Sequence, residues 1–264
     1  MYDKLLPYMR CAICSGTELS LVSKGVHCGS CGKLFPIRSG VLDMVPDDSA
    51  EVITPFQRLM QSSLIASVYE KMWRKIGYFL ASSRSFNHEI KTVLRMAEKG
   101  DRTRTLDLAC GPGVFSRPLA RRSSGIYIGL DLSRPMLNQA QRSTHKDGMR
   151  NLTFIRATAF RLPFVDAAFT YVNCCGALHL FDRPDAALDE VARVLGPGGH
   201  FCVQTTIRPS RSVGFAYFLE RFIRFGFFDE AELRQKLSAR GFSIIDHERH
   251  RISFTFLAKR QKNH

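Results

Sequence analysis

Short apolar runs alternate with segments of helical periodicity between residues 105 and 205. The apolar runs 105–109, 126–130, 152–156, 169–174 and 200–205 predict strands. The segments 115–122, 135–142 and 185–195 lie between them and predict helices. Strands that alternate with helices in this way favour a parallel sheet with helices on both faces.

The residues on either side of this region follow other patterns. The tail predicts a helix at 229–240 and then two strands, 242–248 and 252–258, which we expect to form an antiparallel hairpin at the sheet edge. Residues 47–100 show apolar positions at three-and-four spacing and predict helices, one of them near 86–98. Residues 1–46 read as short strands and turns around cysteines. We therefore divide the chain into units 1–46, 47–100 and 101–264.

Composition places the chain among ordinary globular proteins. Its 264 residues are 45% hydrophobic and 23% charged, enough for one α/β domain with a small appendage. No apolar run reaches the ~18 residues of a membrane span, and the N-terminus lacks the layout of a secretion signal. Eight cysteines without an extracellular context suggest reduced thiols, so we expect a cytoplasmic protein.

The net charge of +14 is unevenly distributed along the chain. Residues 1–50 contain five Lys/Arg and five Asp/Glu, so the excess positive charge lies further along. A basic surface favours anionic partners such as RNA, an anionic membrane surface or a carboxylated substrate. It does not choose among them.

The segment 105–116 has the pattern of a cofactor-binding loop. An apolar strand ends in Gly111-Pro112-Gly113, and a helix follows at once. Glycine lets the backbone approach a ligand closely, and N–H groups at a helix start bind polar groups. Asp131 ends the next strand, 18 residues after Gly113, where a carboxylate can accept hydrogen bonds from ribose hydroxyls. Together these features predict an adenosine-containing cofactor; another Rossmann-type nucleotide binder is the alternative.

Several stretches, in order, resemble the class I S-adenosylmethionine-dependent methyltransferases of the ubiquinone-biosynthesis-type subgroup. LDLACGPG is similar to the first motif of that family and IGLDLSRPML to its second. ATAFRLPFVDAAFTYV and ALHLFDRPDAALDEVARVLGPGGHFCVQT are similar to the motifs that lead into its fourth and fifth strands. The resemblance covers about residues 103–207. It implies a Rossmann-like α/β fold with a seven-stranded, mostly parallel sheet and flanking helices.

The resemblance also implies that S-adenosyl-L-methionine lies across the strand tips. By position, its methionine part would contact Asp107, Ala109, Gly111 and Gly113, and its ribose Asp131 and Leu132. Its adenine would lie near Thr158 and Ala159, and its sulfonium near Cys174–Gly176. Two positions depart from the family pattern. Ala109 stands where glycine is common, and Thr158 replaces the aspartate that usually contacts adenine. Adenine recognition is therefore expected to use stacking and backbone contacts.

Methyl transfer depends mainly on alignment of the acceptor, the methyl group and the sulfur. A general base is needed only where the acceptor atom carries a proton. His179 follows the strand 169–174, where the acceptor would lie, and is the candidate base; the other interpretation is that it only packs there.

Two further segments are candidates for covering the acceptor. In enzymes of this family the helical region that corresponds to 47–100 often covers the substrate, which makes Tyr69, Trp73 and Arg74 candidate contacts; core packing is the alternative for Trp73. The aromatic and basic segment 215–228, which includes Phe215 and Phe218, is interpreted as a lid, as core or as a membrane-surface contact.

Four cysteines near the N-terminus have the spacing of a structural zinc site. Cys11 and Cys14 form one pair and Cys28 and Cys31 the other, with thirteen residues between the pairs. Four thiolates close the coordination sphere of Zn²⁺ and leave no position for catalysis. The following KLFPIRSGVLDMVP is similar to the zinc-ribbon tail of small methyltransferase-activator proteins. We expect a zinc-ribbon module with an architectural role.

These observations leave three functions to weigh. The leading hypothesis is methylation of a small, hydrophobic or aromatic molecule on oxygen, nitrogen or carbon. An RNA or protein methyltransferase that uses the basic surface is the alternative, and a non-catalytic or cyclase-like protein that keeps the donor pocket is another. Asn173-Cys174-Cys175-Gly176 does not match the tetrapeptide typical of exocyclic-amine methylation. The sequence predicts no oligomeric state.

Overall fold

The computed structural model describes residues 2–45, 78–79, 81–209 and 226–262. The strands of the N-terminal module are β1 (Leu19–Val22), β2 (Gly25–Cys28), β3 (Leu34–Arg38) and β4 (Val41–Asp43). The later strands are β5 (Arg104–Leu108), β6 (Ile126–Asp131), β7 (Leu152–Arg156), β8 (Phe169–Cys175), β9 (Leu195–Thr206), β10 (Phe242–His250) and β11 (Ser253–Arg260). The α-helices are α4 (Phe86–Ala97), α5 (Ser116–Arg121), α6 (Arg134–Lys146), α7 (Pro184–Val194) and α9 (Glu230–Ser238).

The strands form one sheet. Its order among the described residues is β1-β2-β3-β4-β7-β6-β5-β8-β9-β11-β10. The pairs from β4 to β9 are parallel, and β11 and β10 complete the sheet as an antiparallel hairpin. The mostly parallel α/β architecture and the edge hairpin are therefore confirmed. The expected count of seven strands is wrong, because the N-terminal module continues the sheet and brings it to eleven strands within the described part of the chain.

The elements predicted from periodicity recur with small shifts at their ends. The strand expected at 200–205 begins earlier, because β9 starts at Leu195 and is already paired there with Phe169 of β8. The register shifts between Phe169 and Tyr171, and the glycine-rich turn 196–199 takes up the extra residues. The turn at residues 196–199 therefore lies within β9 and is not a separate loop before it.

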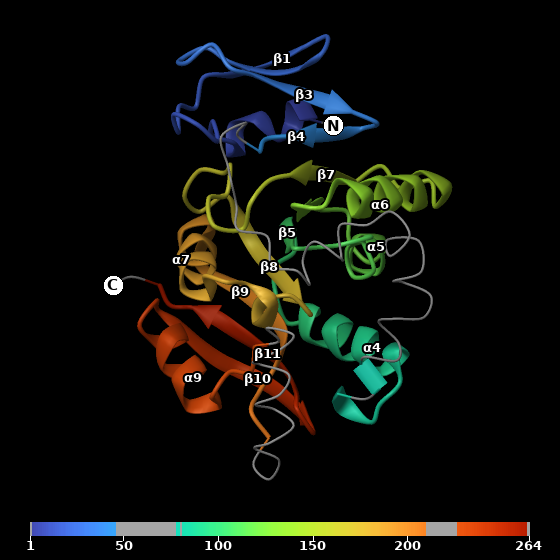
Figure 1. Cartoon of the computed structure of the whole chain (residues 1–264), viewed down its shortest axis with the longest axis vertical. Coiled ribbons are helices and arrows are strands. Elements are labelled where there is room, and N and C mark those ends of the chain that lie inside the picture. The colour runs from blue at the N-terminus through green and yellow to red at the C-terminus, as the bar shows by residue number, and fades with distance from the viewer. Residues whose placement is uncertain (1, 46–77, 80, 210–225, 263–264) are drawn as a thin grey trace.

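Helices cover both faces of the sheet, as Figure 1 shows with α4, α5 and α6 on one side and α7 and α9 on the other. The first face is packed by apolar side chains of α4, α5 and α6 such as Leu94, Leu119 and Leu137. The opposite face is packed by α7 and α9, through residues such as Val191 and Leu233. None of the described helices has the length and apolar character that a bilayer crossing requires.

The N-terminal module shares the core of the larger domain. β4 pairs with β7 in parallel, with Val41 opposite Phe154 and Leu42 opposite Ile155. Met9 forms an isolated bridge with Phe164, and both side chains are fully buried. The module at residues 1–46 thus completes one edge of the sheet and does not form a sheet of its own (Figure 1).

Candidate active site and zinc centre

The strand order reverses its direction between β5 and β8. The chain runs from β5 outward through β6 to β7, and then returns to the other side of β5 for β8 and β9. Ligands of open α/β sheets bind where the order reverses in this way, outside the carboxyl ends of the strands. The tips of β5, β6 and β8 carry the loop 109–113, Asp131 and Gly176 respectively. The fold therefore brings the predicted donor-binding segments to one edge.

The loop after β5 has a left-handed backbone at three positions. The φ angles of Ala109, Gly111 and Gly113 are 54°, 54° and 77°. A Cβ on Gly113 would approach the Ala140 Cβ of α6 to 3.3 Å, so this glycine permits close helix packing. A Cβ on Gly111 would meet no protein atom within 4 Å. Gly111 thus leaves open space at the strand tip, where a ligand can approach the backbone.

Ala109 adopts its left-handed conformation although it has a Cβ. Such a conformation costs about 1–2 kcal/mol for a residue other than glycine. Cys110 N donates to Leu130 O at 3.0 Å and Gly113 N donates to Cys110 O at 3.0 Å, and these bonds hold the turn. Strain that the surrounding structure maintains in this way is typical of ligand-binding loops.

Asp131 lies at the tip of β6 and is bound to the glycine loop. Its Oδ2 accepts a hydrogen bond from Gly111 N at 2.8 Å, and its Oδ1 accepts one from Ser133 N at 2.8 Å. Burial raises the pKa of Asp131 above its usual range, although the N–H groups of Ser133, Gly111 and Leu132 oppose this. Each carboxylate oxygen has a further lone pair, so the residue can also accept ribose hydroxyls.

Asp107 lies on β5, two residues before Ala109, and both of its carboxylate oxygens accept hydrogen bonds inside the protein. Its Oδ2 accepts a short hydrogen bond from Ser116 Oγ at the start of α5, and its Oδ1 accepts one from Asn173 Nδ2 at 2.6 Å. Asn173 Oδ1 in turn accepts from Cys175 Sγ at 3.2 Å. The carboxylate therefore joins β5, β8 and α5. Asn173 and Ser116 were missed as site residues because no motif spacing marks them.

The remaining predicted donor contacts lie around the same edge. Leu132 and Ala159 are partly exposed. Thr158, beyond β7, uses its Oγ1 to accept from Phe160 N at 3.1 Å. Cys174 is fully buried in the core with its pKa raised by burial, so only its backbone could face a donor.

An aromatic group lies beside the predicted adenine loop. The Phe160 ring packs edge-to-face against Phe181 with centroids 5.6 Å apart. The Arg183 guanidinium lies over the same ring, 4.4 Å from its centroid. This arrangement provides a flat apolar surface next to Thr158, which is in keeping with adenine recognition by stacking.

His179 lies in a short 3-10 helix, Leu178–Leu180, that follows β8. The side chain is buried, and its Nδ1 is 3.4 Å from Thr205 Oγ1 of β9. Its carbonyl oxygen accepts from Gly226 N at 3.0 Å. A Cβ at Gly226 would lie 2.4 Å from that oxygen, so glycine is required for this contact. His179 is thus held next to the carboxyl end of β8.

The predicted acceptor contacts Tyr69, Trp73, Arg74, Phe215 and Phe218 lie outside the described residues. The predicted covering region 47–100 is described only for 78–79 and 81–100, which include α4. α4 packs against α5, β9 and β11. The described part of this region therefore belongs to the sheet's helical layer.

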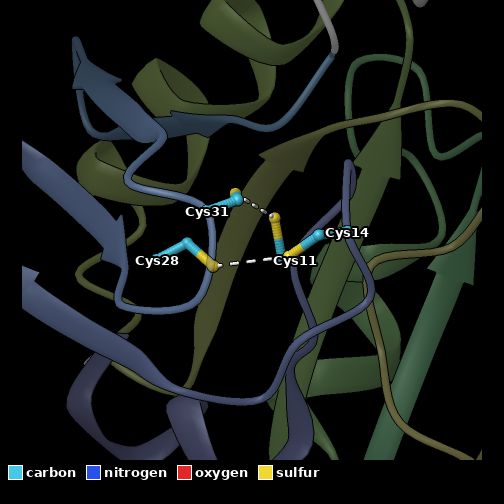
Figure 2. A group of neighbouring side chains, drawn as sticks. All are labelled: Cys11, Cys14, Cys28 and Cys31. Carbon is cyan, nitrogen blue, oxygen red and sulfur yellow. Dashed lines mark hydrogen bonds between the residues drawn. The ribbon is translucent and has the colours of Figure 1, made fainter.

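The four N-terminal cysteines converge on one point, as Figure 2 shows. Their Sγ atoms all lie within 4.8 Å of one another. Cys11 and Cys31 are 3.7 Å apart, as are Cys14 and Cys28. A tetrahedral Zn²⁺ with bonds of about 2.3 Å requires sulfur atoms about 3.8 Å apart. The geometry of these thiols therefore fits a zinc ion.

Backbone contacts around the thiols support the same chemistry. Ile13 N donates to Cys11 Sγ at 3.4 Å and Gly16 N donates to Cys14 Sγ at 3.4 Å. Burial disfavours the Cys28 thiolate, but the Cys31 N–H and the Cys31 and Cys14 thiols stabilise it and lower the pKa of Cys28 to about 7. Although a backbone N–H opposes it, burial and the neighbouring thiols conversely raise the pKa of Cys31, so without a metal the negative charge is held mainly by Cys28. Donors aimed at sulfur stabilise the thiolate form that binds metal.

One residue of the module binds two arginines that lie next to the loops predicted to bind the nucleoside. Asp43, at the end of β4, is 9% exposed and accepts a short hydrogen bond from Arg134 Nη2, at the start of α6. It also accepts from Arg156 Nη1, at the end of β7, at 3.3 Å. Arg156 Nε donates to Leu132 O at 2.9 Å. We call Asp43, Arg134 and Arg156 the Asp43 clamp; its members are 22 to 113 residues apart in sequence, and no motif reveals them.

Comparison with known proteins bears on the central segment. Residues 105–199 match the family described as "Methyltransferase domain". An uncharacterised chloroplastic methyltransferase of Arabidopsis thaliana is 33% identical over 75% of the chain and 59% of its own length. The demethylmenaquinone methyltransferase of Lactococcus lactis is 33% identical over 54% of the chain and 56% of its own length. The chain thus spans little more than half the length of these relatives.

The fold of the methyltransferase domain also recurs among solved structures. A chain from the complex between the Haloferax volcanii Trm112 methyltransferase activator and a putative methyltransferase has a TM-score of 0.61. The identity is 18%, over 81% of this chain and 99% of that chain. A likeness at this identity concerns the fold. The zinc-ribbon assignment and the cytoplasmic location stay predictions.

Proposed function

We propose that this chain is an S-adenosyl-L-methionine-dependent methyltransferase that acts on a small, hydrophobic or aromatic molecule. The observation that carries the proposal is the bond between Gly111 N and Asp131 Oδ2 at 2.8 Å, beside the open space in front of Gly111. A carboxylate and a Cβ-free backbone at adjacent strand tips can grip a ribose and let the rest of the nucleoside pass close to the chain. When bound, the donor supplies an activated methyl group.

The residues around the donor then have separate tasks. Asp131 accepts the ribose hydroxyls, while the Asp107–Ser116–Asn173 contacts keep the glycine loop in place. The flat surface at Phe160 borders the adenine. His179, at the end of β8, takes a proton from an acceptor that carries one, and its contact with Thr205 fixes the orientation of the ring.

Calorimetric titration with S-adenosylmethionine and S-adenosylhomocysteine tests the donor site. The Asp131→Ala variant should bind both about 100-fold more weakly, because two hydrogen bonds to a charged group are lost. Asp189→Ala, on α7 and away from the strand tips, should bind as the wild type does. Asp131→Asn and a thermal unfolding curve separate loss of the contact from loss of the fold. Equal affinity in wild type and Asp131→Ala would show that the ribose site is wrongly assigned.

The pH dependence of donor binding is a second test of the role of Asp131. Burial raises the pKa of Asp131, so protonation begins at a higher pH than for an ordinary aspartate. Because the protonated form accepts hydrogen bonds less well, donor affinity should fall on acidification from a pH above the usual aspartate range. The fall should be absent from Asp131→Asn. A wild-type affinity that is flat across this range would contradict the role given to Asp131.

The acceptor class is tested by turnover. The name of the Lactococcus lactis relative, demethylmenaquinone methyltransferase, supports a small acceptor. We expect turnover with apolar ring compounds and little effect of salt, whereas an RNA acceptor would give binding that falls steeply with salt. For an acceptor with a protonated atom, His179→Ala should lower kcat about 100-fold. Tight donor binding without turnover of any acceptor would favour a non-catalytic or cyclase-like role.

A further inference from the structure

Three potential metal ligands converge between α4 and β10, and none of them belongs to the predicted donor-binding segments or to the four thiols. They are His88 of α4 and Glu248 and His250 of β10, and their ligand atoms lie within 4.8 Å of one another. The Nε2 atoms of His88 and His250 each lie 2.6 Å from Glu248 Oε1. Their side chains are 25% to 35% exposed, so the group is open to ions from solvent. We call these residues the His–Glu–His group.

Secondary structure positions each member of the group. Ser85 caps α4 by accepting from His88 N, which places His88 in the first turn of the helix. Glu248 and His250 are two residues apart on a strand that alternates between half-buried and exposed positions. They therefore share the face of β10 that is turned toward α4. The group consequently joins two elements that are 160 residues apart in sequence.

Thr92 orients the Glu248 carboxylate through one oxygen and leaves the other oxygen for a metal ion. Thr92, one turn after His88 on α4, donates from Oγ1 to Glu248 Oε2 at 3.1 Å. Both imidazoles point at the other oxygen, Oε1. A ligating carboxylate held through its second oxygen is a usual feature of metal sites, since such partners orient the ligands.

One positive charge lies beside the Glu248 carboxylate. Arg95 Nη2 is 3.5 Å from Glu248 Oε2, on the side away from the imidazoles. Its Nη1 bonds to Asp246 at 2.7 Å, and its side chain is 47% exposed. Pairing and solvent screening both reduce its repulsion of a cation at Oε1.

We propose that the His–Glu–His group binds a divalent cation of the zinc type. Two imidazole nitrogens and a carboxylate oxygen form a ligand set that Zn²⁺ accepts, with at least one position left for water. On binding, the ion takes the place of the contacts between each Nε2 and Oε1; each imidazole binds in its neutral form through Nε2 with its one ring proton on Nδ1, and any second ring proton leaves to solvent. The ligands separate from hydrogen-bond distance to the roughly 3.3 Å that tetrahedral bonds of about 2.0 Å require.

Such an ion would fasten α4 to the C-terminal hairpin. The proposal is independent of methyl transfer and of the four-thiolate site, because the three ligands touch neither. A metal-binding measurement without donor therefore tests it alone, and a failed donor titration would leave it unaffected.

The experiment is a zinc titration of the full chain against a chromophoric chelator, with metal content measured before and after. We expect two Zn²⁺ per chain, one held tightly by the thiols and a weaker one that dialysis against chelator removes. The His88→Ala/His250→Ala double variant should retain only the tight ion. Glu248→Gln should lose the weaker one, and Thr92→Val should weaken it about 10- to 100-fold, as loss of an orienting partner does.

His247→Ala is the matched control, because His247 lies on the same strand at an exposed position of the opposite face. It should bind the weaker ion as the wild type does. A wild-type chain that takes up one ion only, with that ion unaffected in the double variant, would overturn the proposal. So would a second ion that persists in the double variant. A thermal unfolding curve of each variant shows that the fold is present.

Discussion

The parallel strands β7-β6-β5-β8-β9 are extended on their two sides in physically different ways. At the C-terminal end, β11 pairs with β9 over seven residues and continues into β10, so backbone hydrogen bonds carry the junction. At the N-terminal end, β4 pairs with β7 over only three residues. The side chains there compensate, with Leu42 and Met44 almost fully buried and Asp43 bound to two arginines.

The side chains at the two ends also differ in how deeply they are buried. The inner face of β10 carries Asp246, Glu248 and His250, which are partly exposed. Asp246 and Glu248 pair with side chains of α4 and with Lys99 just beyond it, and His250 pairs with Glu248. The module instead buries Cys11, Cys28, Phe35 and Met9 in the core of the domain. A module of this size has too little apolar surface to fold alone, so the thiols predicted to bind Zn²⁺ are expected to be essential. The pairing of the hairpin with β9 depends on backbone hydrogen bonds, and an ion at the His–Glu–His group would only add a link to α4.

The largest expected effect is therefore loss of a zinc ligand. Cys28→Ala should lower the free energy of unfolding by more than about 4 kcal/mol, because loss of the metal also unfolds the strands that cover one edge of the core. Cys174→Ala is the matched control, since that cysteine is equally buried but lies in β8; about 1 kcal/mol is expected there. Denaturant unfolding and zinc content measure both. Equal losses in the two variants would contradict the assigned role of the metal.

An intermediate effect is expected at the Asp43 clamp. Asp43→Asn removes the negative charge between Arg134 and Arg156 and should cost about 1–3 kcal/mol of stability. Because these arginines adjoin the predicted ribose and adenine loops, donor affinity should also fall, by about tenfold. Calorimetry and zinc analysis on the same sample test this.

Asp166→Asn is the control for the clamp, because Asp166 also pairs with an arginine, Arg193, but is 78% exposed. It should change neither donor affinity nor zinc content. If Asp43→Asn lost zinc together with donor affinity, the clamp would act only by stabilising the N-terminal module and not by positioning the donor loops.

The smallest effect is expected at the hairpin end. Asp246→Asn removes ion pairs with Arg95 at 2.7 Å and Lys99 at 2.8 Å, whose side chains are about half exposed. Solvent-exposed pairs contribute about 0.2–1 kcal/mol each, so the free energy of unfolding should fall by about 1 kcal/mol or less. Denaturant unfolding at low and high salt measures it. A loss as large as that of Asp43→Asn would contradict the contrast between the two ends.

Local patterns in the sequence predicted the elements of the methyltransferase domain and its glycine loop. The loop after β5 requires glycine at Gly111 and Gly113, and Asp131 follows at a characteristic distance, so both features are readable from neighbouring residues. The two cysteine pairs are readable in the same way. The contacts of Asp107 with Ser116 and Asn173 were not predicted, because hydrogen bonds across strands follow no fixed spacing.

The sequence by itself therefore determined the alternation of strands and helices, the glycine loop with its acid, and the four thiols, since each depends on residues close together in the chain. Only the tertiary structure decided that β4 extends the sheet beside β7 and that Asp43 holds Arg134 and Arg156. It also decided that His88 meets Glu248 and His250. These contacts join residues tens to more than a hundred positions apart, and their geometry exists only once the sheet has assembled.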